Sequence, residues 1–268
     1  MGKMSAPRMA IILGAGQGKR LLPLTAQSPK CLLPLGGRPF LEWQIIALAA
    51  NGIRDVVVVT GFQAQAVEAA ILARPADGVR VRTLHNPFFQ VADNIGSCFV
   101  ARHEMEGGDF VLLNGDTLFH PELFAQASAR AEAPIAVTID RKERYDADDM
   151  KVRLDGCRLA AIGKTLSEEH THAESIGMLF FSGDGGRLFA DALERVIRQE
   201  DGLKRWYLSV IDELAASTPI GIADICGHEW CELDYPKDLP AAERLANRLW
   251  REHPGTCESA APLRSQAT

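Results

Sequence analysis

The sequence predicts an α/β fold with a mainly parallel mixed sheet flanked by helices. Strand-like and helix-like patterns alternate through the first half of the chain. Several strand-like segments are continuous apolar runs, as in DVVVVT at 55–60, which is typical of strands covered on both faces. Polar side chains follow some of these runs directly, as in NGD at 114–116. Because ligands of such folds bind beyond the carboxyl ends of the strands, we expect function to gather there.

In the first half, local signals mark where the helices begin and end. Pro39 suits the first turn of one helix, and Asn51-Gly52 ends it. Asp93 or Asn94 can cap the start of another. The resulting expectation is strands over 9–13, 55–60, 79–84 and 110–113, and helices over 40–49, 63–73 and 95–106.

The second half adds a small β insertion that we expect to form one wall of a substrate pocket. Asp155-Gly156, between two strand-like segments, is a hairpin signal. We expect strands over 134–140, 150–154, 157–164, 175–181, 220–225 and 228–233, and helices over 187–199, 203–216 and 236–250. One domain over 9–252 then lies between a flexible leader at 1–8 and a disordered tail at 253–268.

The composition is that of an ordinary globular protein, and it limits the partners. Of 268 residues, 47% are hydrophobic and 24% are charged. The net charge of -6 argues against a nucleic acid partner. No apolar run has the length of a membrane span or of a signal-peptide core, so we expect no membrane partner. Six cysteines without a C-x-x-C pair favour reduced thiols and a cytoplasmic location, and the sequence leaves a homo-oligomer open.

The strand at 9–13 leads into a glycine-rich, cationic loop, GAGQGKR at 14–20. Glycines on alternate positions let the backbone approach a ligand closely and present several N–H groups to it. Lys19 and Arg20 add positive charge directly after the last glycine. The loop therefore predicts a site for the phosphates of a nucleotide.

Two common phosphate loops do not fit this spacing. The dinucleotide fingerprint, counted from Gly14, needs a third glycine at position 19, which is Lys19. A P-loop needs Ser or Thr after Gly-Lys, where this chain has Arg20, and a glycine five positions before that pair, where it has Leu13. A different nucleotide-binding signature is required.

The stretch at 10–30 resembles the signature of nucleotidyltransferases, the pyrophosphorylase-like enzymes that activate sugar phosphates and small phospho-alcohols. The resemblance rests on the glycine loop ending in Arg20, then LLPLT at 21–25 and Pro29-Lys30, in register. It implies a Rossmann-like fold of the nucleotide-diphospho-sugar transferase type, with catalytic roles for Arg20 and Lys30. The nucleotide-binding residues that it implies in the loop are Leu13, Gly14, Ala15, Gly16, Gly18 and Lys19.

Two strand exits carry candidate metal ligands. Asp116 follows the apolar run at 110–113, and a triphosphate needs a divalent cation, for which carboxylates are suitable ligands. In HEWCELD at 228–234, Glu232 and Asp234 share one face of an extended segment. This ending resembles the W-x-E-x-D of the cytidylyltransferase branch that includes the phosphocholine enzymes. The resemblance implies Mg²⁺ on Asp116 and Asp234, with Glu232 as a third candidate, whereas the alternative for each aspartate is a helix cap.

The segment NIGS at 94–97 separates branches of this family. Sugar nucleotidyltransferases have an LGTA-like segment here, whereas N-x-x-S, with Asn86-Pro87 upstream, resembles the branch that couples CTP to phosphocholine or aminoethylphosphonate. Asn94 and Ser97 are therefore nucleotide-binding candidates; the alternative is a cap and an ordinary helix residue.

The acceptor pocket is expected between this segment and the β insertion. By resemblance, the acceptor-binding candidates are Lys151, Lys164, Glu174 and Tyr207, although each charged one can also be a solvated residue at a strand end. Trp206, Tyr207 and Trp230 either form a cage for a quaternary ammonium or belong to the core.

The resemblance implies an Mg-dependent nucleotidyltransferase that joins a nucleoside monophosphate from an NTP, with CTP favoured, to a small phosphorylated or phosphonate acceptor and releases pyrophosphate. A sugar-1-phosphate uridylyl- or guanylyltransferase is the alternative within the class. An inactive nucleotide-binding regulatory subunit is the alternative outside it. The intact set of Arg20, Lys30, Asp116 and Asp234 disfavours the regulatory subunit.

Overall fold

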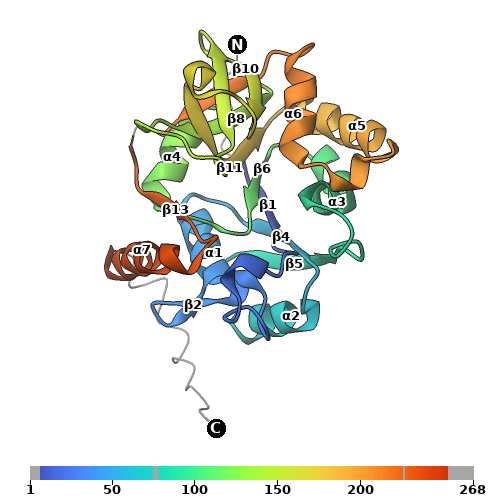
Figure 1. Cartoon of the computed structure of the whole chain (residues 1–268). Coiled ribbons are helices and arrows are strands. Elements are labelled where there is room, and N and C mark those ends of the chain that lie inside the picture. The colour runs from blue at the N-terminus through green and yellow to red at the C-terminus, as the bar shows by residue number, and fades with distance from the viewer. Residues whose placement is uncertain (1–6, 75–77, 226, 253–268) are drawn as a thin grey trace.

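A nine-stranded mixed sheet forms the centre of the computed structural model, which describes residues 7–74, 78–225 and 227–252. The strands lie in the order β5-β4-β1-β6-β11-β8-β12-β10-β9. Figure 1 shows β5, β4, β1, β6, β11 and β8 of this sheet. Their bounds are β1 Met9–Leu13, β4 Asp55–Thr60, β5 Arg80–His85, β6 Phe110–Asn114, β8 Ile135–Asp140, β9 Lys151–Asp155, β10 Arg158–Gly163, β11 Ala173–Phe181 and β12 Gly221–Asp224. The predicted mixed sheet flanked by helices is confirmed.

The first half of the sheet is parallel. β1 lies between β4 and β6, and β5 pairs with the outer side of β4, all in parallel register. Leu13, the last residue of β1, is opposite Asn114, the last residue of β6. The two loops that follow these strands therefore begin side by side, as the strand-exit argument requires.

Antiparallel pairing enters with the second half of the chain. β11 pairs antiparallel with both β6 and β8, and β12 pairs parallel with β8. β9 and β10 form the predicted hairpin around Asp155 and Gly156, and β9 also reaches the start of β11. This hairpin is the expected small β insertion, and it lies at the edge of the sheet.

Alternate residues of the central strands face two separate apolar layers, because successive side chains of a strand point to opposite faces. Ile11 packs in the layer under α3 (Asn94–Val100), α5 (Gly185–Ile197) and α6 (Tyr207–Ala215). Ala10 and Ile12 pack under α1 (Phe40–Ala50), α2 (Ala64–Ala73) and α4 (Pro121–Arg130). Figure 1 shows α3, α5 and α6 gathered on one side of the sheet and α1 and α4 on the other.

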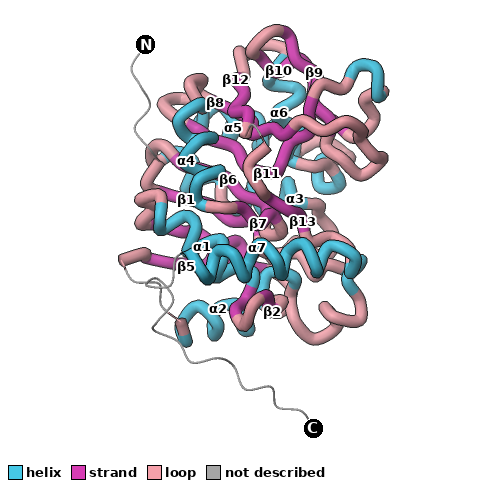
Figure 2. The backbone as a smooth tube through the Cα atoms, turned by 90° about the vertical axis from the view of Figure 1, so that its left-hand side faces the viewer, coloured by secondary structure: helices cyan, strands magenta, loops and turns pink. Residues whose placement is uncertain are grey.

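A third apolar cluster attaches the last helix, α7 (Leu239–Glu252), to the body of the protein. It includes Trp43 from α1, Leu118 from β7 (Thr117–Phe119) and Leu245 from α7. β7 pairs antiparallel with β13 (Trp230–Glu232), and β2 (Pro34–Leu35) with β3 (Arg38–Pro39). Figure 2 shows α7 passing beside α1 and close to β13.

Three predicted boundaries differ from the structure. The helix expected over 95–106 is α3 followed by a separate 3-10 helix at Arg102–Glu106. The helix expected over 203–216 begins at Tyr207, because Trp206 has an extended backbone and caps it. The carbonyl of Arg8 accepts hydrogen bonds from the amides of Arg54 and Asp55, so a residue of the expected leader joins the start of β1 to the start of β4. The tail expected at 253–268 and residues 1–6 lie outside the described residues.

None of the helices in the described part of the chain combines the length and the apolar character needed to cross a membrane.

Candidate active site

The glycine loop leaves β1 in a conformation that the following segment holds in place. Gly18 has φ of 74°, in the left-handed region that glycine adopts readily. The buried Thr25 hydroxyl donates to the carbonyl of Gly18 at 2.8 Å. A methyl group at Gly18 would also lie 3.0 Å from Cβ of Lys30. The loop, Thr25 and Lys30 are therefore one packed unit, which explains why these residue types occur together in the sequence.

The exit of β6 packs directly on this loop. A Cβ added at Gly115 would lie 2.5 Å from the carbonyl oxygen of Leu13 and 3.0 Å from Cα of Gly14. Only a residue without a side chain fits at this contact. The contact brings Asp116 to the base of the glycine loop.

Asp234 reaches the same place from far along the chain. β13 runs antiparallel to β7 with Glu232 opposite Thr117, and the amide of Leu233 donates to the carbonyl of Asp116 at 3.1 Å. The alternative role of Asp234 as a helix cap is not found, because Tyr235 is the N-cap of the short helix at Pro236–Asp238 and the carboxylate of Asp234 meets Lys30 and Arg20.

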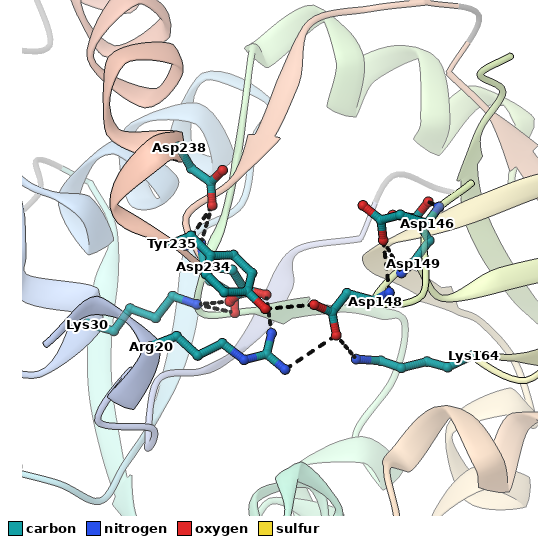
Figure 3. Close-up of polar contacts among 10 residues, drawn as sticks. Arg20, Lys30, Asp146, Asp148, Asp149, Lys164, Asp234, Tyr235 and Asp238 are labelled. Atoms are coloured by element: carbon teal, nitrogen blue, oxygen red, sulfur yellow. Dashed lines mark hydrogen bonds and ion pairs between the residues drawn. The ribbon is translucent and has the colours of Figure 1, made fainter. Parts of the chain in front are cut away.

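Lys30 joins the two aspartates. Figure 3 shows Lys30 directed at Asp234, with Nζ 2.5 Å from Oδ1 of Asp234. Nζ also lies 2.8 Å from Oδ2 of Asp116, and the side chain of Lys30 is only 12% exposed. Burial alone would lower the pKa of Lys30, but the charges and hydrogen bonds of the two carboxylates raise it above its ordinary value. Lys30 therefore carries a fixed positive charge at the floor of the site.

The carboxylates have the character that a magnesium ion requires. Oδ1 of Asp116 is buried and has no hydrogen-bond partner within the described residues. Burial and the charges of Asp116 and Asp234 raise the pKa of Glu232 to about 8, so negative charge is crowded here. No group of three His, Cys, Asp or Glu side chains in the described ranges forms a ready metal cluster. Mg²⁺ commonly uses one or two carboxylates and completes its shell with phosphate and water oxygens, so Asp116 and Asp234 fit it as a pair.

Two recesses share Asp116 in their lining. The first is lined by the glycine loop and by the segment from Asn86 to Ser97, and it includes Lys19, Asn94 and Asp116. Asp93 caps α3 by accepting the amide hydrogen of Asn94. Asn94 and Ser97 both line this recess, and Oδ1 of Asn94 accepts the amide hydrogen of Tyr207 at 2.9 Å. Of the residues that the sequence predicted to bind the nucleotide, six line this recess: Leu13, Ala15, Gly16, Lys19, Asn94 and Ser97. Gly18 lines a neighbouring recess beside Arg20, and Gly14 lines neither.

The second recess contains Asp116, Asp148, Lys164, Glu174, Trp206 and Asp234. At its far end, Nζ of Lys142 lies 2.7 Å from Asp149 and 2.9 Å from Glu174. Burial raises the pKa of Glu174 to about 7, whereas the pKa of Asp149 is lowered because its hydrogen bond and charge contact with Lys142 outweigh its burial. The ammonium of Lys142 therefore pairs with two carboxyl groups, and of these two the Glu174 carboxyl holds a proton near neutral pH.

Asp148 connects the two halves of the site (Figure 3). Its Oδ1 lies 3.4 Å from Arg20 of the glycine loop and 3.5 Å from Lys164 of the β insertion. Its Oδ2 accepts a hydrogen bond from the hydroxyl of Tyr235 at 2.7 Å. Arg20 also lies 3.3 Å from Asp234 and stacks over the ring of Tyr235. A single carboxylate therefore meets cations from the nucleotide side and from the acceptor side.

Two predicted acceptor contacts are not found. Lys151 is 6% exposed and donates to the carbonyl of Lys164 at 3.0 Å, so it supports the wall of the recess from behind. Tyr207 is fully buried, and its hydroxyl donates to Oδ1 of Asn114 at 3.1 Å. Both are structural supports in this arrangement, while Lys164 and Glu174 do line the recess.

Of the two alternatives for Trp206, Tyr207 and Trp230, the aromatic cage is not formed. Nζ of Lys164 lies 4.6 Å from the ring centre of Trp206 and occupies its face. Nε1 of Trp230 donates to Asp140 at 2.8 Å, and Tyr207 is behind the wall. Of the three aromatic residues, Trp206 alone lines the acceptor recess.

Sequence reasoning missed Asp148, Lys142 and Asn114 as members of the site. Asp148 and Lys142 lie in the loop between β8 and β9, whose sequence has no periodicity to give its direction. Asn114 carried a usable signal, because it immediately precedes Gly115 and Asp116 at a strand exit. Its side chain faces both recesses, and Gly177 leaves room for it: a Cβ there would lie 2.3 Å from Nδ2 of Asn114.

Comparison with known proteins gives one matching family and several relatives. Residues 10–214 match the family described as MobA-like NTP transferase domain. The chain is 30% identical over 253 residues to the CMP-5'-(3-aminopropyl)phosphonate synthase of Streptomyces rubellomurinus; the match covers 89% of this chain and 39% of that protein. It is 25% identical over 234 residues to the 2-aminoethylphosphonate cytidylyltransferase of Lancefieldella rimae, covering 87% of this chain and 90% of that protein.

Among solved structures, the inositol-1-phosphate CTP transferase of T. maritima has the same fold. The TM-score is 0.77 at 22% sequence identity, and the match covers 96% of this chain and 99% of that one.

Proposed function

The chain belongs to the MobA-like NTP transferase domain family, and from that premise we propose that it transfers a cytidylyl group from CTP to a small phosphonate or phosphate that also carries an amine. An oxygen of the acceptor attacks the α-phosphorus of CTP, the bond from that phosphorus to the bridging oxygen breaks, and pyrophosphate leaves. The observation that carries this proposal is the convergence of Lys30, Asp116 and Asp234 where the two recesses meet.

The chemistry needs alignment and charge rather than a general base. The second pKa of a phosphate is about 6, so the attacking oxygen is already ionised at neutral pH. Lys30 is held at the junction and can stabilise charge around the α-phosphate. Arg20 and Lys19 border the glycine loop and suit the departing pyrophosphate.

Mg²⁺ is part of the proposal. Asp116 and Asp234 would hold it, and the unpartnered Oδ1 of Asp116 supports this. Bound there, the ion would offset the negative charge of the triphosphate. We place the reaction in the cytoplasm, and we leave the oligomeric state open.

The choice of CTP and of an aminated acceptor rests on two kinds of support. The relatives named above are a CMP-phosphonate synthase and a cytidylyltransferase of an aminophosphonate. In this chain, Lys164 lines the acceptor recess and suits a phosphonate group. Asp149 and Glu174 line the same recess and suit an ammonium that takes the place of Lys142, which pairs with both of them. The face of Trp206 is occupied by Lys164, which disfavours a quaternary ammonium there.

Assays of each nucleoside triphosphate with each acceptor test the proposal. The full chain with Mg²⁺ is assayed for pyrophosphate release with each of CTP, UTP, GTP and ATP, and with aminoethylphosphonate, aminopropylphosphonate, phosphocholine, inositol 1-phosphate or glucose 1-phosphate. We expect the highest kcat/KM for CTP with an aminophosphonate, and ethylphosphonate, which lacks the amine, serves as the matched control. Faster turnover with a sugar 1-phosphate and UTP or GTP would refute the assignment, and no pyrophosphate from any pair would support the regulatory alternative.

A further inference from the structure

Gln44 of α1 holds the turn that carries Asp116. Its side chain is fully buried, and Nε2 donates to the carbonyl oxygens of Asn114 at 2.8 Å and of Thr117 at 2.9 Å. Because both partners are carbonyl oxygens, which can only accept, this end of the side-chain amide is its NH₂ group. One side chain of α1 therefore bonds to both ends of the turn.

The other end of the same amide is unfavourable to bury. Oε1 of Gln44 is buried and has no hydrogen-bond partner within the described residues. A buried acceptor without a partner destabilises a protein, and such atoms are rare in native structures. Eight residues of α1, which the structure describes throughout, are buried, and the other seven are apolar or aromatic. Packing alone therefore does not explain an amide at this position.

Other contacts hold the same turn against the sheet. The hydroxyl of Thr117 donates to the carbonyl of Ile176 in β11 at 2.9 Å, and the amide of Leu233 donates to the carbonyl of Asp116 at 3.1 Å. Gln44 adds the attachment to α1. Since Asp116 lies in the chain between the two residues that Gln44 bonds, a shift at either of them moves the carboxylate of Asp116.

We propose that Gln44 is a positioning residue, which sets the carboxylate of Asp116 for a divalent cation. The inference rests on the proposed function, in which Asp116 is a metal ligand. Oδ2 of Asp116 is held by Lys30 at 2.8 Å, and its buried Oδ1 has no partner in the described part of the chain. Removing a group that orients a metal ligand typically lowers metal affinity or activity by about 10- to 100-fold.

Two variants of α1 separate this role from a general role in stability. Gln44→Met keeps the length of the side chain and removes both hydrogen bonds together with the unpaired oxygen. Asn51, at the carboxyl end of α1, gives a matched control, because its Nδ2 donates to the carbonyls of Ala47 and Pro121, each at 2.9 Å. Asn51→Leu also removes two hydrogen bonds from an amide to carbonyls, and one of these joins α1 to the start of α4.

Mn²⁺ binding in the presence of CTP is measured by electron paramagnetic resonance on the full chain. We expect Gln44→Met to weaken Mn²⁺ binding and to lower kcat, each at least about tenfold, with the KM of the acceptor within about threefold of wild type. Asn51→Leu should keep Mn²⁺ affinity and kcat within about twofold of wild type. In the Asp116→Asn background, Gln44→Met should change Mn²⁺ affinity less than about twofold, because Gln44 acts through Asp116.

Three results would overturn the proposal. They are wild-type Mn²⁺ affinity in Gln44→Met, an equal loss in Asn51→Leu, and an undiminished effect of Gln44→Met in the Asp116→Asn background. Thermal melts show whether each variant folds. If Gln44→Met does not fold, Gln44→Glu decides, since it keeps the shape of the side chain but has at most one hydrogen to donate, and wild-type affinity there would overturn the inference.

The same titrations distinguish failure of the inference from failure of the proposed function. If the wild type binds no Mn²⁺ with CTP, or if Asp116→Asn binds it as tightly as the wild type, the proposed metal site and this inference fail together. If Asp116→Asn weakens Mn²⁺ binding and Gln44→Met does not, only the inference fails.

Discussion

Nζ of Lys30 and Oδ1 of Asp234 lie 2.5 Å apart, although 204 positions separate the two residues in the chain. The contact joins the segment after the glycine loop to the segment after β13. Asp116 completes it from the end of β6, so three distant parts of the sequence meet at one ammonium group. We expect catalysis to depend on this contact among the three side chains more than folding does.

Lys30→Met is expected to lower kcat/KM by about 100-fold or more, because it removes the positive charge from the place where the α-phosphate would react. The free energy of unfolding should fall by only about 1 kcal/mol, since Asp116 and Asp234 remain partly exposed to water. Pyrophosphate release and urea unfolding measure the two effects. Lys204→Met, at an exposed lysine away from the site, is the control. Wild-type turnover in Lys30→Met would refute the role of Lys30.

Asp116→Asn is expected to weaken the binding of Mn²⁺, used as a paramagnetic substitute for Mg²⁺, by about tenfold or more in the presence of CTP. The amide keeps the size of the side chain but loses the charge that attracts the cation. Electron paramagnetic resonance measures the bound ion independently of turnover. Asp109→Asn, on the loop before β6, provides a matched control away from the recesses. Equal Mn²⁺ affinity in both variants would remove Asp116 from the metal site.

Gly115→Ala is expected to lower the free energy of unfolding by about 2 kcal/mol, because the added methyl group meets backbone atoms of Leu13 and Gly14 that cannot move independently. The shift should also separate Asp116 from the glycine loop and lower nucleotide affinity. Gly163→Ala is the matched control, since a Cβ there meets nothing within 4 Å. If both variants have the wild-type midpoint in urea, the close contact between the loops is not a constraint.

Glu174→Gln should change how stability depends on pH. The raised pKa of about 7 means that protonated Glu174 stabilises the fold at low pH and that this contribution is lost as the pH rises from the unfolded value of 4.5 through about 7. Gln keeps a neutral group throughout. Relative to wild type, the variant should gain about 2 kcal/mol of unfolding free energy between about pH 5 and about pH 8. Glu169→Gln, at a side chain that is 78% exposed, should show no such trend, and a flat difference for Glu174→Gln would contradict the prediction.

Asp148→Asn should strengthen the binding of inorganic pyrophosphate about threefold, because Asp148 occupies Arg20 and Lys164, the cations that phosphate groups require. Stability should change by less than about 0.5 kcal/mol, since these ion pairs are exposed. Calorimetric titration measures the affinity, with Asp201→Asn as an exposed control for the loss of one negative charge. Weaker binding in Asp148→Asn would mean that Asp148 holds the cations in position for the ligand instead of competing with it.

The sheet and the floor of the site could be predicted from the sequence for one physical reason. Apolar runs such as 55–60 identify buried parallel strands, and the carboxyl ends of such strands lie together. Asp116 and the glycine loop could therefore be brought together without knowledge of any contact. Asp234 was predicted because the segment at 228–234 resembles a segment of the cytidylyltransferase branch. The pairing of β13 with β7 explains physically why Asp234 reaches the site.

The acceptor side was less predictable because it depends on contacts far apart in the chain. Lys151 and Lys164 look equivalent in sequence, but Lys151 points inward to the carbonyl of Lys164, whereas Lys164 faces the recess. Asp148 lies in an irregular loop, and its contact with Arg20 spans 128 positions. Tyr207 was predicted to bind the acceptor, but α6 begins at Tyr207 and buries it, and Trp206 is the aromatic residue that lines the recess.

The position of Asp234 also determines how much of the chain is needed for a working unit. The family match ends at residue 214, before β13 and α7. A fragment cut at that boundary would lack one of the two proposed magnesium ligands and the strand that pairs with β7. It would also leave Trp43 and Leu118 without the helix that covers them. Anyone who expresses or transplants this domain should therefore take its end from the completed site, beyond α7, and not from the extent of sequence similarity.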